Sequence, residues 1–316
     1  MQAATLDWLT DRIVDVLARG ERVGPAAVLL LLHRFSAGRR ADLAQPLGAA
    51  LAREMDLQAR QGCAAGALES EECAGWLAVF SQAAIISDDP RLPRAAADLL
   101  TGVRSSWGPP SGGPIRLKPD PTGGEPDPTG GETRGIFVAP VMRAVEACLV
   151  SVNVPEAREL AAEAIDALER AVAGAYRPGE GMSHRIAGSP FVRGALADQV
   201  RSASALLTAY MLTARLPYAM LADELMQRVV RAPAADGDAP FALACDAARV
   251  LCRLAALHHD DEYRRTAVLA IDTDYVHEAT RALEALAPSV RELGADAAPF
   301  GLALAEWLVV CDEIAH

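Results

Sequence analysis

The feature that most constrains the fold is a helical periodicity of apolar residues that runs through most of the chain. In Leu196–Thr213, apolar side chains recur in steps of four, three, four and three residues, and residues 243–257 repeat the same steps. A period of 3.6 residues places such side chains on one face of an α-helix. Strand-like alternation is almost absent. The sequence therefore predicts an all-α protein.

Short polar turns separate pairs of these periodic segments and recur roughly every 50 residues. Four of the turns, SDDPRL, VNVPEA, ARLPYA and HHDDEY, begin at residues 87, 152, 214 and 258, and a fifth surrounds SAGRRADL at residues 36–43. Three of the four carry a proline where a second helix would begin, and its fixed φ suits the first helical turn. Each unit is thus predicted to be a helical hairpin, as in helical arrays and toroids.

The longer connections all precede the first helix of a hairpin, at residues 62–70, 107–135, 176–194 and 232–239. If the hairpins stack side by side, the short turns lie on one rim and the long connections on the other, which we call the loop rim. The loop rim also collects the N-termini of the first helices, whose free N–H groups favour anionic or hydroxylated ligands. We therefore expect a functional site there.

The longest connection contains the heptapeptide PDPTGGE twice in tandem, at residues 119–132. Its glycines and prolines, without an apolar anchor, favour a solvated spacer, and a working loop is the alternative. We expect one domain over residues 1–316, an α/α toroid of helical hairpins with a flexible insertion at about 107–135.

Charge and composition restrict the possible functions. Forty-two acidic residues against 30 basic ones give a net charge of −12, which disfavours nucleic acid and anionic membrane surfaces as partners. The apolar run at residues 28–32 is too short to span a membrane, and the N-terminus lacks the pattern of a signal peptide. Cys245 and Cys252 fall on one helix face as core residues, with a redox or metal function as the alternative. We expect a cytoplasmic protein with reduced thiols.

The hairpin segments also resemble a known family. They include APVMRAVEACLVSVNVPEARELA, LADQVRSASALLTAYMLTARLPYAMLADEL and DAARVLCRLAALHHDDEYRRTA, all within residues 136–263. These segments resemble the helical part of a family in which a thioredoxin-like domain precedes a six-hairpin α/α barrel. That barrel is related to N-acylglucosamine 2-epimerases and six-hairpin glycosidases, so the resemblance implies an α/α toroid.

The positions where that family carries its chemistry differ in this chain. GALESEECAG precedes Trp76 where the family has His-Phe-Glu-Lys-Met and Tyr-Asp-Asn, and residues 137–140 replace a Trp-Asn-Gly-Leu motif. Asp198, within LADQ, matches the family's Leu-Glu-Asp. We expect no thioredoxin-like domain. The resemblance implies a degenerate barrel that binds a small polar or sugar-like ligand, or a protein partner, with little or no catalysis.

The connection that ends at the helix beginning near Leu196 supplies most candidate site residues. The candidate catalytic residues are Asp198, Asp246 and His184, and the candidate ligand-binding residues are Arg185, Arg193 and Gln199. A carboxylate near His and Arg can act as a general acid or base on a sugar. The alternative function is therefore an active glycoside hydrolase or sugar epimerase. The structural alternative for both aspartates is a helix N-terminal acid that stabilises the helix dipole.

Two histidine-containing segments resemble metal motifs. VHEATR, at residues 276–281, has Arg281 where a zinc-binding helix needs a second histidine. HHDDEY coincides with a hairpin turn, where Asp260 is predicted to cap the next helix. We predict neither a metal nor a cofactor.

Overall fold

The computed structural model describes residues 2–61, 67–107, 137–186, 192–232, 239–266 and 273–314. Helices contain 83% of the described residues and strands or bridges 3%, so the all-α prediction is confirmed. Two antiparallel strands of two residues each, β1 (Tyr176–Arg177) and β2 (Gly181–Met182), form a hairpin that the sequence did not predict. The heptapeptide repeat lies outside the described residues.

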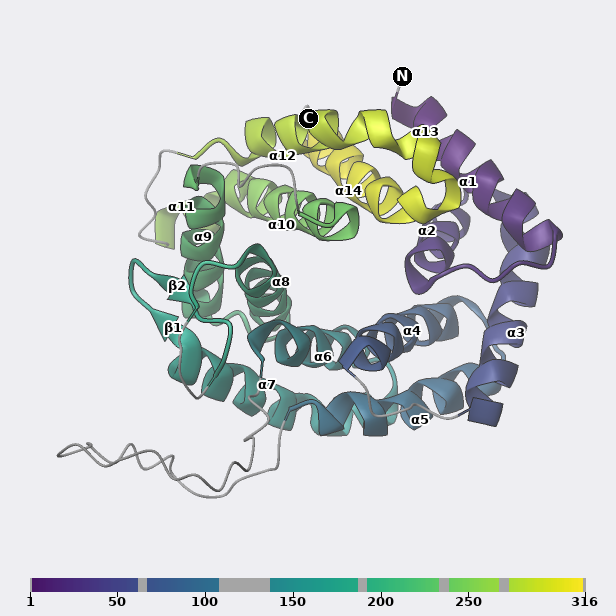
Figure 1. Ribbon diagram of the computed structural model, residues 1–316, viewed down its shortest axis with the longest axis horizontal. Helices are drawn as coiled ribbons and strands as arrows, with labels where there is room; N and C mark the ends of the chain where they lie inside the picture. The colour runs from purple at the N-terminus through teal and green to yellow at the C-terminus, as the bar shows by residue number, and fades with distance from the viewer. Residues whose placement is uncertain are drawn as a thin grey trace, which may run out of the picture.

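Six helices of the described chain pack against one another in a closed cycle (Figure 1). In the order of contact, these ring helices are α2 (Pro25–Ser36), α4 (Ala67–Ile86), α6 (Val138–Val150), α8 (Leu196–Thr213), α10 (Phe241–His259) and α14 (Ala298–Ile314). The cycle closes because α14 packs against α2. Four of the ring helices, α4, α6, α8 and α10, are those that precede the four turns identified in the sequence.

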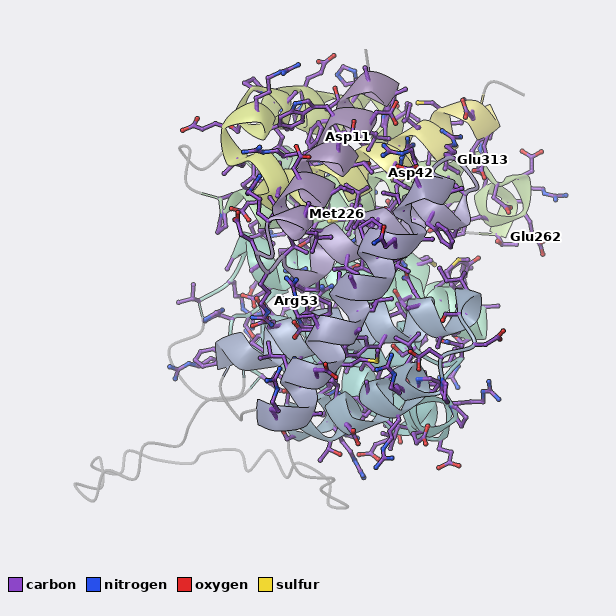
Figure 2. The ribbon with its side chains drawn as sticks, turned by 90° about the vertical axis from the view of Figure 1, so that its right-hand side faces the viewer. Asp11, Asp42, Arg53, Met226, Glu262 and Glu313 are labelled. Atoms are coloured by element: carbon purple, nitrogen blue, oxygen red, sulfur yellow. The ribbon has the colours of Figure 1, made fainter. Side chains whose placement is uncertain are left out.

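A second set of helices lies outside the ring (Figure 1). These outer helices are α1 (Gln2–Ala18), α3 (Ala44–Gln61), α5 (Arg91–Ser105), α7 (Pro155–Ala175), α9 (Leu216–Arg231) and α12 (Tyr275–Leu286). Short pieces complete the chain: η1 (Ala41–Leu43), α11 (Asp261–Thr266), η2 (Ala287–Ser289), α13 (Val290–Leu293) and η3 (Gly294–Ala297). Helices α5, α7 and α9 each pack against the ring helix that precedes them. The side view shows exposed acidic residues on the outer surface, including Asp11, Asp42, Glu262 and Glu313 (Figure 2).

Two of the three turn prolines begin a second helix as the sequence predicts, whereas Pro90 is the N-cap residue that precedes α5. Pro155 is the first residue of α7, and Pro217 is the second residue of α9. Asp260 Oδ1 accepts hydrogen bonds from the backbone N–H groups of Glu262 at 2.7 Å and Tyr263 at 2.9 Å, so it caps α11 as expected.

Close packing around α2 depends on two glycines. A Cβ on Gly301 of α14 would lie 2.5 Å from Leu30 Cδ2, and one on Gly75 of α4 would lie 2.6 Å from Pro25 Cγ. These contacts are shorter than van der Waals distance, so larger residues would push both neighbours of α2 away from it. The apolar stripes of α8 and α10 face the core, with Val200, Ala203, Leu207, Ala247, Val250 and Leu254 buried.

Candidate functional site

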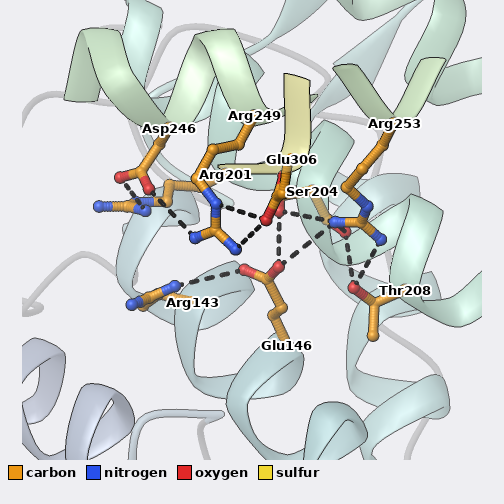
Figure 3. A network of polar contacts seen from close by, with 9 residues as sticks. All are labelled: Arg143, Glu146, Arg201, Ser204, Thr208, Asp246, Arg249, Arg253 and Glu306. Carbon is orange, nitrogen blue, oxygen red and sulfur yellow. Dashed lines mark hydrogen bonds and ion pairs between the residues drawn. The ribbon is translucent and has the colours of Figure 1, made fainter. Parts of the chain in front are cut away.

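A cluster of charged and hydroxyl side chains lies on the inner side of the ring, where the side chains point toward one another (Figure 3). Its nine members, which we call the interior cluster, are Arg143, Glu146, Arg201, Ser204, Thr208, Asp246, Arg249, Arg253 and Glu306. They come from α6, α8, α10 and α14. Glu146 of α6 lies 3.7 Å from Arg253 of α10, although α8 stands between these helices in the ring. The contact therefore crosses the inner side of the ring.

Ser204 connects three of these helices. Its Oγ donates a hydrogen bond to Glu146 Oε1 at 2.5 Å and accepts one from Arg253 Nη1 at 3.2 Å. Arg253 Nη2 also donates to Thr208 Oγ1 at 3.0 Å. Hydrogen bonds to charged groups are stronger than neutral ones, so these contacts fix the carboxylate, the hydroxyls and the guanidinium relative to one another.

Two further carboxylates complete the interior cluster. Arg201 Nη1 donates to Asp246 Oδ2 at 2.7 Å. Arg249 Nε and Nη2 donate to Glu306 Oε1 at 2.8 and 2.6 Å. Asp246, one of the candidate catalytic residues, is thus held by a guanidinium rather than paired with a second carboxylate.

Arg143 differs from the other arginines of the cluster. Within the described part of the chain it makes no hydrogen bond, and its Nη1 lies 3.6 Å from Glu146 Oε2. Its side chain is 25% exposed. The cluster holds four arginines against three carboxylates, an excess of positive charge in a protein whose net charge is −12. Arg143 therefore presents N–H donors that an anion could occupy.

Burial and neighbouring charges shift the pKa values of the cluster in different directions. Burial raises the pKa of Glu146, but the charges of nearby arginines, Arg143 and Arg253 first, and the hydrogen bond from Ser204 together outweigh it, so the pKa lies below its ordinary value. Burial lowers the pKa of Arg253. For Arg249 burial also lowers the pKa, but nearby carboxylates outweigh it and the pKa is raised. Glu146 is therefore ionised at neutral pH and unsuited to donate a proton.

The connection before α8 and the first turn of that helix bring two candidate residues together, His184 and Asp198. His184 Nδ1 lies 3.0 Å from Asp198 Oδ2, and Asp198 Oδ1 accepts a hydrogen bond from the Ala139 N–H at 3.2 Å. Asp198 is 0% exposed, whereas the His184 side chain is 45% exposed. Burial raises the pKa of Asp198, and His184 and the Ala139 N–H partly offset the rise. Asp198 thus orients the imidazole and satisfies a donor in the first turn of α6.

The other three candidates hold the connection before α8 in place. The buried Gln199 amide accepts from the Met182 N–H and donates to the Met182 carbonyl, both at 2.9 Å, which fixes β2 against α8. Arg193 Nη1 donates to two backbone carbonyls at 2.9 and 3.2 Å. The Arg185 guanidinium lies 5.3 Å over the Phe137 ring.

The predicted catalytic residues therefore fall into two groups: His184 with Asp198 at the start of α8, and Asp246 in the interior cluster. Sequence reasoning missed the rest of the cluster. The sequence does contain a signal for these residues, because charged residues recur at helical spacing within otherwise apolar helices. On α6, for example, Arg143 and Glu146 are three residues apart.

Among the described residues, no group of three His, Cys, Asp or Glu side chains could hold a metal ion. Cys245 and Cys252 are buried, and burial raises the pKa of each thiol to about 12. Cys73 is disulfide-bonded, so the expectation of reduced thiols is wrong for this residue. Cys63 lies outside the described residues.

One segment, Tyr275–Ile314, is long and apolar enough by length and composition to cross a membrane. Its most apolar window is 50% buried, and α14 within it packs against α2 and α10. The core helix of a soluble protein passes the same test, so the segment is weak evidence for a membrane span.

No protein-family model and no curated protein matches the chain. The resemblance to six-hairpin barrels therefore rests on the sequence segments alone.

Proposed function

We propose that the chain is a degenerate α/α toroid of the six-hairpin glycosidase-like type, and that its interior binds a small anionic polar ligand such as a sugar acid, with little or no catalysis. The closed cycle of contacts through the ring helices and the outer helices packed on it support the toroid. The interior cluster supports the binding site, because its side chains meet where such a ring would enclose a ligand.

The main support for this proposal is that arginine side chains inside the ring are partly exposed. The side chains of Arg143, Arg249 and Arg253 are 25%, 32% and 28% exposed, although they come from helices that pack around the same interior. A guanidinium presents donors that match a carboxylate in two parallel hydrogen bonds. The hydroxyl of Thr208 and the carboxylate of Glu306 can bond to ligand hydroxyl groups.

Binding is favoured over catalysis because Glu146, the carboxylate that contacts both Ser204 and Arg253 in the interior cluster, is not suited to act as an acid. Glycoside hydrolysis needs one carboxylic acid whose pKa is raised so that it can protonate the leaving group. The pKa of Glu146 is shifted the other way, and Asp246 is held by Arg201 at 2.7 Å.

Calorimetric titration with D-glucuronate and with neutral D-glucose tests the proposal. Glucuronate should bind more tightly, and Arg143→Gln should weaken its binding by at least about tenfold, since a hydrogen bond to a charged group is worth roughly 1.5–3 kcal/mol. Arg104→Gln is the matched control, because Arg104 pairs with Glu163 on the outer helices. Equal affinity for both sugars, or equal loss in both variants, would contradict the proposal.

A second candidate function, a carbohydrate-processing enzyme, is favoured by the His184–Asp198 pair. A buried carboxylate that orients a half-exposed imidazole is an arrangement that general bases use. Hydrolysis of a panel of aryl glycosides would detect such an activity. Asp198→Asn should then reduce the rate by roughly two orders of magnitude or more, and a rate that does not depend on His184 would exclude this function.

A further inference from the structure

A cavity lies outside the ring, between the outer helices α9 and α12 and over α10, and we call it the outer groove. Its volume is about 1200 Å³. Its apolar surface includes Leu225 of α9, Leu243, Ala247 and Leu251 of α10, and Ala282 and Leu286 of α12. On α10, Asp246 and Arg249 belong to the interior cluster, so this helix presents one face to each site.

One end of the outer groove is cationic. Arg228 and Arg231, in the last turn of α9, both line it. Arg228 Nη1 donates to the Gly179 carbonyl at 2.7 Å, and Arg231 Nη2 donates to Gln227 Oε1 at 3.3 Å. Neither guanidinium pairs with a carboxylate in the described part of the chain.

The acidic residues of the groove are already engaged. Arg281 Nη2 donates to Glu278 Oε2 at 2.5 Å, so this pair on α12 is neutral. Glu224 accepts hydrogen bonds from the Tyr176 hydroxyl at 2.7 Å and the Gly179 N–H at 3.3 Å. An apolar channel with two carboxylate-free arginines at one end complements a molecule that is apolar along its length and anionic at one end.

We propose that the outer groove binds a fatty acid, with its chain along α10 and its carboxylate at Arg228 and Arg231. The volume exceeds the range of roughly 300–1,000 Å³ that is usual for small-molecule sites, so it accommodates a flexible chain. A partner helix fits the charges less well, because the cationic pair is confined to one end and the opposite wall carries the neutral pair Glu278 and Arg281.

Titration with octanoate, decanoate and dodecanoate below their micelle concentrations tests this proposal, with 1-decanol as the neutral probe. Each buried methylene should tighten binding by about fourfold, so dodecanoate should bind roughly two hundredfold more tightly than octanoate. Decanoate should bind at least about tenfold more tightly than 1-decanol, because only the carboxylate engages the arginines.

Two groups of variants locate the ligand. Arg228→Gln with Arg231→Gln should remove the preference for decanoate over 1-decanol, whereas Arg264→Gln with Arg265→Gln, on exposed positions of α11, should keep it. Ala285→Trp, at an exposed position that lines the groove, should abolish binding of both probes. Arg143→Gln should leave decanoate affinity unchanged, which separates this site from the interior cluster.

Three results would overturn the proposal: affinity independent of chain length, equal binding of decanoate and 1-decanol, or a double arginine variant indistinguishable from its α11 control. If Ala285→Trp prevents folding, which circular dichroism would reveal, the double arginine variant decides, because both arginines are exposed.

Discussion

Asp198 and Asp246 both lie in the N-terminal part of a ring helix, in the adjacent helices α8 and α10, yet their surroundings differ. Asp198 is completely buried, and its partners are one imidazole and one backbone N–H. Asp246 keeps 19% of its side chain exposed and is held by the guanidinium of Arg201. A carboxylate buried without a permanent cation is costly, and the raised pKa of Asp198 reflects that cost. Similar positions in a helix therefore leave one carboxylate fully buried and place the other in a partly exposed charged cluster.

The largest expected effect comes from removing the buried carboxylate. Asp198→Ala should lower the free energy of unfolding by about 2–4 kcal/mol, because it leaves the Ala139 N–H without an acceptor and His184 without its partner. Asp246→Ala should cost about 1 kcal/mol, since water can reach Arg201 and replace the lost contact. Urea denaturation measures both values, and a larger loss for Asp246→Ala would reverse the comparison.

Within the interior cluster, the serine that links three helices should have an intermediate effect. Ser204→Ala removes the donor to Glu146 and an acceptor of Arg253, so the free energy of unfolding should fall by about 1.5 kcal/mol. Ser105→Ala is the control, because its hydroxyl bonds to the Gly102 carbonyl on the exposed end of α5. Equal effects in thermal or urea denaturation would show that the cluster contributes nothing beyond a surface contact.

The two regions should also respond to pH in opposite ways. The pKa of Asp198 is raised on folding, so its contribution to stability falls as pH rises from about 4 through the folded value. The pKa of Glu146 is lowered on folding, so its contribution is present above about 4 and is lost as pH falls through the folded value. In urea denaturation across pH, Asp198→Asn should remove the first dependence and Glu146→Gln the second. If instead Asp198→Asn removed the second dependence and Glu146→Gln removed the first, the directions of the two pKa shifts would be wrong.

The contrast also shows what the sequence can and cannot predict. Apolar periodicity and turn residues such as Pro155 and Asp260 predicted the helices and their pairing, because these are local properties. The ring interior was not predicted, because Glu146 and Arg253 are 107 positions apart and meet only once α6, α8 and α10 are packed. The proximity of His184 and Asp198 was predictable, since both belong to one connection. The complete burial of Asp198 was not, because it depends on the start of α6.

The smallest expected effect concerns a region far from either aspartate in sequence. Deletion of one PDPTGGE copy, residues 119–125, should change the free energy of unfolding by less than about 0.6 kcal/mol, because the entropy of closing a loop depends only weakly on its length. A loss of several degrees in melting temperature would show that the insertion packs against the helices and contributes to stability.

The most direct test of ligand binding at the interior cluster is a crystal structure of the protein grown with D-glucuronate. The carboxylate of the sugar should lie within hydrogen-bonding distance of the Arg143 guanidinium, with sugar hydroxyls near Thr208 or Glu306 on the inner side of the ring. If the sugar is found instead beside His184, or if only water occupies the interior at saturating glucuronate, the interior cluster is not the ligand site.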